Sequence, residues 1–474
     1  MRSALAYASI ALGLSAAVAC AASDDGAPPP TNDPGPSVVT EAGTTDGQPD
    51  DVVTPNVPTC SSAGWCLTTL PDSDLTLKDI RPFETRAFAI AQSPTLGVKI
   101  LEWDEAAHKW SYIDDNSQNT FELDAYAGKL WAPNENELYF AVAPAFIYHG
   151  KRAAPASPWS WERSELEDHS ADGRPDRDHG RVQYLNWREL PLESIALGVW
   201  GTSADDVYAW YSNTIFHWKS ADGGAPEWVP EYIAEDSENP EDSFFIFAAG
   251  GSSSEDVWFA GGRGRYDDWS IFRCPMVIHK AAGSYDRVVD SAINPSDEET
   301  HYFYSCLEKR DVLGFSWHNG KDTLHYPHGG WLTSIDSAGA GRAVGILGED
   351  MLAFVEAGGG GAGIARANRV AAQVPRARLP ALVDSVSVNG NDTWISGWGV
   401  VLHAPTDPAR WSTGYGLFTT DDAKQLGIDA ATYAFSPTAI NGAPLDKPLY
   451  QVRGTSNTNL WAIGLHYALH KTTP

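Results

Sequence analysis

The sequence predicts an all-β fold: a single β-propeller of seven four-stranded blades, with six or eight blades left open. Three observations lead to this prediction. A short motif returns along the chain, made of a small residue, an acidic or amide residue five positions later, an apolar residue and an aromatic residue. Undisturbed copies lie about fifty residues apart, which is the length of one propeller blade. The two ends of the chain also offer complementary strands.

Each copy of the motif marks the second strand of one expected blade. The clear copies are Gly201…Asp206-Val207-Tyr208, Gly251…Asp256-Val257-Trp258 and Gly454…Asn459-Leu460-Trp461. Copies with one or two changes are Ala132…Glu137-Leu138-Tyr139 and Ser387…Asp392-Thr393-Trp394. Two weak copies lie in register with the repeat but match its residues poorly: Ala87-Phe88-Ala89 and Arg342-Ala343-Val344. Seven copies predict seven blades.

The second blade shows how four strands fill one repeat. They are expected at residues 130–131, 138–142, 146–149 and 184–187, and the last is followed by Leu190-Pro191, where proline would end the ladder. Insertions are expected at residues 150–183, 281–330 and 412–448. The middle insertion could hide a further blade, because its residues 311–315 resemble a strand.

The ends of the domain, residues 59–474, predict how the ring closes. The closing pattern of a blade, a Trp followed shortly by Leu-Pro, occurs from Trp65 to Pro71, ahead of the first full repeat. The last repeat stops after its third strand, Tyr467–His470. Pairing strand 65–71 with the last blade would remove two unpaired sheet edges, so we expect a closed propeller.

The first residues have the features of an export signal. An apolar run from Ala4 to Ala19 is short for a membrane span and ends in small residues before Cys20. We expect a signal peptide over residues 1–19 and a lipid on Cys20, because this ending resembles the bacterial lipobox. The protein would then be anchored to the outer membrane or cell surface. Ala17 stands where Leu is usual, so plain export to the periplasm or medium is the alternative.

Composition supports export and argues against nucleic acid as a partner. Residues 20–58 are rich in Pro, Asp, Thr and Gly and predict a disordered linker. The four cysteines after Cys20 suit two disulfides in an oxidising compartment, expected as Cys60–Cys66 and Cys274–Cys306. The formal net charge of −29 disfavours binding to phosphate backbones.

Five histidines occupy one equivalent place on the third strand of their blades: His149, His217, His279, His403 and His470. One histidine per blade places them too far apart to hold a single metal ion, so we expect a packing or hydrogen-bonding role. The motif residues Asp206, Asp256, Asp392 and Asn459 are expected to bond within their own turns. The motif tryptophans are expected to pack between sheets.

One stretch has the spacing of a calcium loop. Asp168, Ser170, Asp172 and Asp176 place oxygens at positions one, three, five and nine, with a glycine at six. It resembles the loops of EF-hand, dockerin and FG-GAP repeats, which implies Ca²⁺ as a cofactor. His179 replaces the glutamate of position twelve, so any binding would be weak, and a solvated acidic loop is the alternative reading.

The sequence predicts the function of the protein less clearly than its fold. No nucleophile elbow, zinc-protease motif or phosphate loop occurs in the sequence, so no catalytic residue is predicted. The repeat G-[ST]-[ST]-x-x-D-V-[WY]-[AF] resembles that of secreted propeller lipoproteins of soil bacteria such as myxobacteria. The resemblance covers most of residues 65–474 and implies a fold and a location but no activity.

Two functions follow from these observations. The favoured one is a monomeric, non-enzymatic scaffold in the cell envelope that binds a protein or glycan through its insertion loops. The alternative is an extracellular hydrolase or lyase that acts on a glycan at the central channel. An enzyme should bring carboxylates or histidines together at the channel, whereas a scaffold should show a broad polar or aromatic rim.

Overall fold

The computed structural model divides the chain into two units, Met1–Asn56 and Val57–Pro474. The residues that it describes all lie in the second unit: 60–120, 126–170, 196–220, 223–267, 270–293, 306–318, 323–324, 330–358, 363–370, 383–406, 434–440 and 445–473. The predicted signal peptide, Cys20 and the linker therefore lie outside the described residues. Within the described ranges, no helix is long and apolar enough to cross a membrane.

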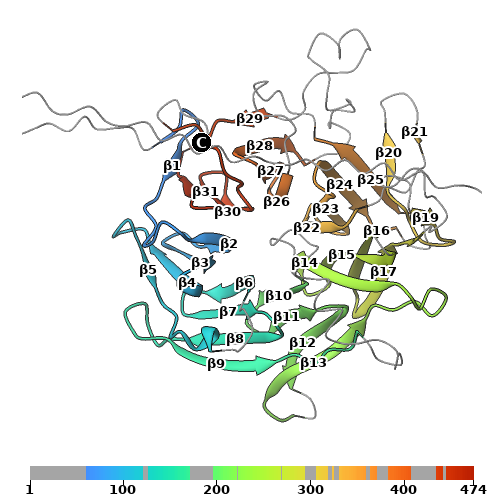
Figure 1. Ribbon diagram of the computed structural model, residues 1–474, viewed down its shortest axis with the longest axis horizontal. Coiled ribbons are helices and arrows are strands. Elements are labelled where there is room, and N and C mark those ends of the chain that lie inside the picture. The colour runs from blue at the N-terminus through green and yellow to red at the C-terminus, as the bar shows by residue number, and fades with distance from the viewer. Residues whose placement is uncertain are drawn as a thin grey trace, which may run out of the picture. The chain divides into compact units, whose positions relative to one another are not determined.

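Seven antiparallel sheets of four strands form the blades of a β-propeller, with the first strand of each blade at the centre (Figure 1). Blade one is β2 (Thr76–Pro82), β3 (Arg86–Ser93), β4 (Gly97–Asp104) and β5 (Lys109–Tyr112). Blade two is β6 (Ala127–Asn134), β7 (Glu137–Val142), β8 (Phe146–Lys151) and β9 (Ser160–Glu165). Blade three is β10 (Leu197–Ser203), β11 (Asp206–Tyr211), β12 (Thr214–Ser220) and β13 (Pro226–Ile233). Blade four is β14 (Ser243–Ser253), β15 (Asp256–Asp267), β16 (Ser270–Ala281) and β17 (Ser284–Val289).

The remaining blades follow in chain order. Blade five is β22 (Leu332–Ser337), β23 (Arg342–Leu347), β24 (Met351–Glu356) and β25 (Ile364–Arg369), extended at its outer edge by β20 (Ser316–His318) and β21 (Thr323–Leu324). Blade six is β26 (Val383–Asn389), β27 (Asp392–Gly397), β28 (Val400–Pro405) and β29 (Ala434–Ser436). Blade seven is β30 (Gln451–Ser456), β31 (Asn459–Ile463), β32 (Ala468–Lys471) and β1 (Trp65–Leu67). Outside the blades lie η1 (Ser117–Asn119) and a two-stranded sheet of β18 (Ser291–Ile293) and β19 (Cys306–Glu308).

The strand order confirms the predicted seven blades and the predicted closure. The last three residues of every copy lie on the second strand of a blade, including the two weak copies on β3 and β23. Strand β1 pairs antiparallel with β32, with Trp65 opposite Lys471 and Leu67 opposite Leu469. Residues 311–315 do not begin an eighth blade, since Leu313 forms only an isolated bridge with Val289.

The outermost strands are where the sequence prediction was wrong. The fourth strand of blade two is β9, not the expected segment 184–187, which lies outside the described residues. The expected insertions at 150–183, 281–330 and 412–448 contain the outer strands β9, β17 and β29. The reason is burial: residues of β9 are all half-exposed or exposed, so this strand carries no apolar run to mark it.

Side chains of one blade accept hydrogen bonds from backbone amides on the inner strand of the next blade. The Leu130 amide donates to Asp79 Oδ2 at 3.1 Å, and the Val452 amide donates to Ser385 Oγ at 2.8 Å. The Val386 amide makes the same kind of bond to Ser334. Because an inner strand has no partner strand on its channel side, these bonds prevent unpaired backbone donors at the centre.

The motif glycine is explained by contact between blades. A Cβ atom at Gly201 would lie 2.9 Å from the Trp131 ring of blade two, and one at Gly251 would lie 2.8 Å from the Trp200 ring of blade three. The tryptophan near the end of one inner strand therefore packs on the glycine of the next blade. A larger residue at either glycine would force the two blades apart.

Candidate functional site

Five blades contain the same group, which is buried or partly buried: the acidic or amide residue of the motif, the motif aromatic residue and the histidine of the third strand. A histidine ring nitrogen meets a side-chain oxygen in each: His149–Glu137 at 2.8 Å, His217–Asp206 at 3.2 Å, His279–Asp256 at 2.8 Å, His403–Asp392 at 2.8 Å and His470–Asn459 at 2.9 Å. The histidine rings lie 3.9–4.6 Å from the aromatic rings, measured between centroids. These contacts confirm the predicted hydrogen-bonding and packing role of the histidines.

The acidic partner of these histidines was missed from the sequence. Bonding within the turn was expected and is present, for example from Ser252 Oγ to Asp256 Oδ2 at 2.5 Å. The bond across to the histidine was not foreseen. Hairpin register could have revealed it, because each histidine stands directly opposite a motif aromatic residue, as Trp258 opposite His279. Residues opposite each other in a ladder interact, so the acid two positions before the aromatic lies within reach.

Blade three carries an enlarged version of this group. His217 Nδ1 lies 3.0 Å from Glu231 Oε1, and Glu231 also accepts from Lys219 Nζ and from Tyr285 Oη of blade four, each at 2.6 Å. Burial alone would lower the pKa of His217, but hydrogen bonds to Asp206 and Glu231 outweigh it and raise that pKa. The pKa of His149, which has one carboxylate partner, is instead lowered by burial. The blade-three cluster thus favours a protonated imidazole and joins two blades.

Blade four projects beyond the other blades. Strands β14, β15 and β16 have 11, 12 and 12 residues, whereas the other second strands have five to eight. The hairpin of β15 and β16 pairs without a break from Asp256–Ala281 to Asp267–Ser270. About six additional residue pairs extend it by roughly 20 Å, at the end opposite the motif turns. We call residues 261–276 the blade-four projection.

A buried ion network stabilises the base of the projection. Arg263 is fully buried, and its guanidinium contacts Asp290 through two nitrogens, Asp236 Oδ2 at 2.8 Å and Asp242 Oδ2 at 3.0 Å. Lys309 also reaches Asp236. Burial would raise the pKa of Asp236, but its hydrogen bonds to Lys309 and Arg263 outweigh it and hold that pKa well below the usual range. The network joins the hairpin to three connecting segments around it.

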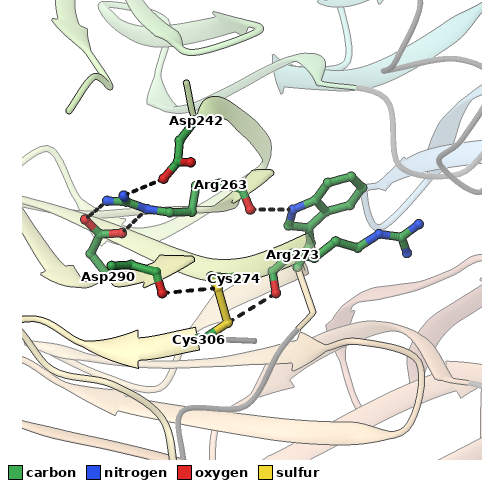
Figure 2. The surroundings of a disulfide bond; sticks show 8 residues. Asp242, Arg263, Arg273, Cys274, Asp290 and Cys306 are labelled. Carbon is green, nitrogen blue, oxygen red and sulfur yellow. Dashed lines mark hydrogen bonds and ion pairs between the residues drawn. A yellow bond between two sulfur atoms is a disulfide. The ribbon is translucent and has the colours of Figure 1, made fainter. Parts of the chain in front are cut away.

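A disulfide lies beside the same network (Figure 2). Cys274 of β16 bonds Cys306 of β19, and Cys306 Sγ lies 3.3 Å from the Arg273 carbonyl oxygen. On the other face of the hairpin, the Trp331 indole donates to the Arg263 carbonyl at 3.2 Å. Both predicted disulfides are present, Cys60–Cys66 and Cys274–Cys306. Covalent and ionic cross-links together fix the base of the projection at Arg263 and Cys274.

The predicted calcium loop is only partly within the described residues. The Ser170 amide donates to Asp168 Oδ1 at 2.9 Å, whereas Asp172 and Asp176 lie outside them. Over the described ranges, no three acidic, histidine or cysteine side chains gather as a metal site. The calcium loop therefore stays a prediction.

The centre of the ring holds a small cavity of about 10 Å³. It is lined by residues of five inner strands and of β11, among them Lys129, Thr333, Gln451, Arg453 and the indole of Trp210. The side chains that line it include two cations and no carboxylate or histidine. Among the described residues, the lining of this cavity therefore offers hydrogen-bond donors and positive charge.

Comparison with known proteins shows similarity of the fold only. No family model and no curated protein sequence matches the chain. Similar solved structures include YCF48 bound to D1 peptide, 11% identical, covering 88% of this chain and 98% of that chain with a TM-score of 0.47. Others are YCF48 from Cyanidioschyzon merolae (10% identical, 87% and 99% covered, TM-score 0.43) and Sqt1 from Chaetomium thermophilum (8%, 86% and 100%, TM-score 0.44). Such distant likenesses indicate no ligand or partner.

Proposed function

We propose that this propeller is a non-enzymatic binding scaffold, exported and held in the cell envelope by a lipid on Cys20, and that it grips a protein partner with the blade-four projection. A glycan is the second class of partner. The single observation that supports this proposal most is the projection itself. It extends one blade well beyond the others and is fixed by a buried Arg263 network and the Cys274–Cys306 disulfide.

Rigidity is what a binding surface needs. Ordering a flexible loop on binding costs free energy, so a surface that is already fixed keeps more of its contact energy as affinity. The polar groups of the five histidine-containing blades are engaged in bonds within the ring. These bonds support the fold, and the described lining of the central cavity contains no acid pair.

The test is a cross-linked pull-down of the tagged protein from its own envelope fraction. The decisive variant replaces residues 265–272 by Asn-Gly, a turn that suits a two-residue hairpin and joins the paired residues Gly264 and Arg273. Arg263 and both cysteines stay in place. We expect the full chain to retain one near-stoichiometric partner and the shortened variant to lose at least about tenfold of it.

The matched control is Leu96→Ser, which changes an exposed apolar side chain in the equivalent turn of blade one. This variant should retain the partner. If the shortened variant melts like the full chain and still captures the partner, the projection is not the binding element. If the full chain captures no partner, the scaffold role fails and glycan-hydrolase screens become the appropriate next step.

We further propose weak calcium binding at Asp168, Ser170, Asp172 and Asp176, motivated by their spacing. Calorimetric titration should show a Kd of about 10⁻⁴–10⁻³ M, the range of extracellular calcium modules. Asp176→Asn should abolish the heat of binding. Asp178→Asn, an acid of the same loop at a non-ligand position, should leave it unchanged. If calcium titration of the unmodified chain gives no heat of binding, the calcium proposal is wrong.

A further inference from the structure

His217 is held differently from the histidines of the other blades. Its Nδ1 lies 3.0 Å from Glu231 Oε1, and its Nε2 lies 3.2 Å from Asp206 Oδ1. Among the five shared groups of the described blades, this is the only ring that lies between two carboxylates. A neutral imidazole has one N–H and one lone pair, so it can donate to only one of them. The geometry therefore favours a protonated ring, which donates from both nitrogens.

Both carboxylates have further donors that favour their ionised form. These donors are Thr202 Oγ1 and Tyr208 Oη for Asp206, and Lys219 Nζ and Tyr285 Oη for Glu231. Burial raises the pKa of Glu231, but its bonds to His217, Lys219 and Tyr285 outweigh burial and hold that pKa well below the usual range. The proton shared by this group therefore resides on the imidazole.

Two further charges approach the group from blade four. Lys280 Nζ of β16 lies 2.5 Å from the hydroxyl of Tyr208, whose ring stacks on His217 at 4.5 Å between centroids. Glu255, in the turn before β15, acts on the same tyrosine with the opposite charge. Both charges interact with Tyr208, so the charge state of the imidazole depends mainly on Asp206 and Glu231.

The other blades indicate which bond a neutral His217 would keep. The other four histidines contact their motif residue through Nε2, at 2.8–2.9 Å: His149, His279, His403 and His470. Asp206 is also held in its turn by its two other donors. After loss of the proton, the remaining N–H should therefore stay on Nε2, and the Nδ1 lone pair would face Glu231. Two acceptors repel each other at this distance, so Glu231 is the partner that would be released.

Glu231 lies where blade three meets blade four. Its Oε2 accepts from Tyr285 Oη of β17 at 2.6 Å. The neighbouring Tyr232 accepts from Arg287 Nε at 3.1 Å, and its ring stacks on Tyr285 at 5.5 Å between centroids. Arg287 also contacts Asp290 of the buried ion network at 3.2 Å. We call Glu231, Tyr232, Tyr285 and Arg287 the blade seam, because they join the outer strands β13 and β17.

We propose that His217 is a proton-operated clasp for the blade seam. When protonated, it holds Glu231 in place to accept from Tyr285. When it loses the proton, it releases Glu231, and β13 and β17 separate more easily. The clasp is therefore closed in neutral solution and opens in alkaline solution.

The direction of this pH dependence follows from the pKa of His217. Burial lowers that pKa, but the bonds to Asp206 and Glu231 outweigh burial and raise it above the ordinary 6.5. A histidine with a raised folded-state pKa stabilises fully below its unfolded-state pKa, and this contribution is lost as the pH rises through the folded-state pKa. The unfolding equilibrium constant should rise by up to about tenfold for each pH unit crossed in that window.

The first test observes the proton directly in the unmodified chain. Nitrogen NMR of ¹⁵N-histidine-labelled protein distinguishes a protonated ring from each neutral tautomer, and His217→Gln identifies the signals of His217. At about pH 7 we expect His217 to be protonated and His149, which has one carboxylate partner and a pKa lowered by burial, to be neutral. At higher pH His217 should become the Nε2–H tautomer. A neutral His217 at about pH 7, or a neutral form that carries its proton on Nδ1, would overturn the proposal.

The second test measures the seam by hydrogen exchange, corrected for the intrinsic effect of pH. Between about pH 7 and about pH 9, protection of β13 and β17 should fall at least about fivefold relative to the outer strands β5 and β9. Tyr285→Phe removes the hydroxyl that Glu231 holds, so this variant should show the lower protection already at neutral pH and change little further.

The matched control is His149→Gln, which removes the equivalent histidine of blade two. This variant should keep the pH response of the seam, whereas His217→Gln should lose it. An equal fall in protection at all four outer strands, or a seam response that persists in His217→Gln, would show that His217 is not the clasp.

Discussion

Arg263→Met should destabilise the propeller by about 3–5 kcal/mol at neutral pH, which is the usual cost of removing one partner from a buried ion network. Methionine has a similar length and no charge, so the loss reflects electrostatics more than packing. Asp236, Asp242 and Asp290 are each less than a tenth exposed, and all three contact Arg263. Without Arg263, their charges would be poorly compensated.

The pH dependence separates this mechanism from a general loss of packing. In the unmodified chain the pKa of Asp236 is depressed, so its contribution to stability is present at neutral pH and is lost as the pH falls through the folded-state pKa. In the variant this carboxyl keeps Lys309 but loses Arg263, so its pKa should be higher than in the unmodified chain. The stability gap between the two chains should therefore shrink on going from about pH 7 to about pH 4.5.

Denaturant unfolding at both pH values checks this, with Arg265→Met as the matched control. Arg265 lies two residues further along β15, is partly exposed and pairs with Asp242 and the exposed Glu241. Asp242 keeps Arg263 in this control, so we expect a smaller loss than in Arg263→Met. Equal losses in the two variants, or a loss from Arg263→Met that does not change with pH, would show that the network is not electrostatically important.

The strands at the hub were predictable from sequence because their environment repeats. A second strand such as β11 is buried along its whole length, so it requires apolar and aromatic residues at fixed positions. At Gly201 and Gly251 the motif glycine is fixed by a tryptophan ring of the neighbouring blade. Burial of the second strand recurs in each blade, and it leaves a periodic pattern even where sequence identity between repeats is low.

The outer strands and the functional elements are not constrained in this way. Strand β9 faces solvent and can vary, so its position could not be found from an apolar pattern. The Arg263 network joins residues 21 to 27 positions apart, plus Lys309, in one blade only. Because the other blades do not repeat this network, the sequence contains no periodic pattern that could predict it.

Trp65→Ala should open the ring at its closing blade. Trp65 lies on β1, is fully buried, donates its indole N–H to Ser436 Oγ at 2.8 Å and packs edge-on against Trp394 at 6.2 Å. Replacing a buried tryptophan by alanine costs about 3–5 kcal/mol through lost burial and the cavity left behind. Because β1 has only three residues and pairs with β32 at three positions, we expect this side chain to be important for holding β1 in place.

The location of the effect matters more than its size. If Trp65 holds the closure, its loss should allow β1 to separate from β32 while the other blades stay folded. Amide hydrogens of β1 and β32 should then exchange faster than those of β11, because local opening needs less free energy than global unfolding. The freed edge of β32 should also promote association through strand pairing, visible as concentration-dependent dimers.

Trp258→Ala is the matched control, since Trp258 is equally buried but lies on β15 in the middle of blade four. It should lose a similar free energy of unfolding without selective exchange at β1 and β32. Uniform exchange across all blades in Trp65→Ala would mean that the ring opens only when it unfolds as a whole. Selective exchange would instead show that closure by two distant chain segments is the weakest joint of the propeller, because β1 and β32 come from opposite ends of the described chain.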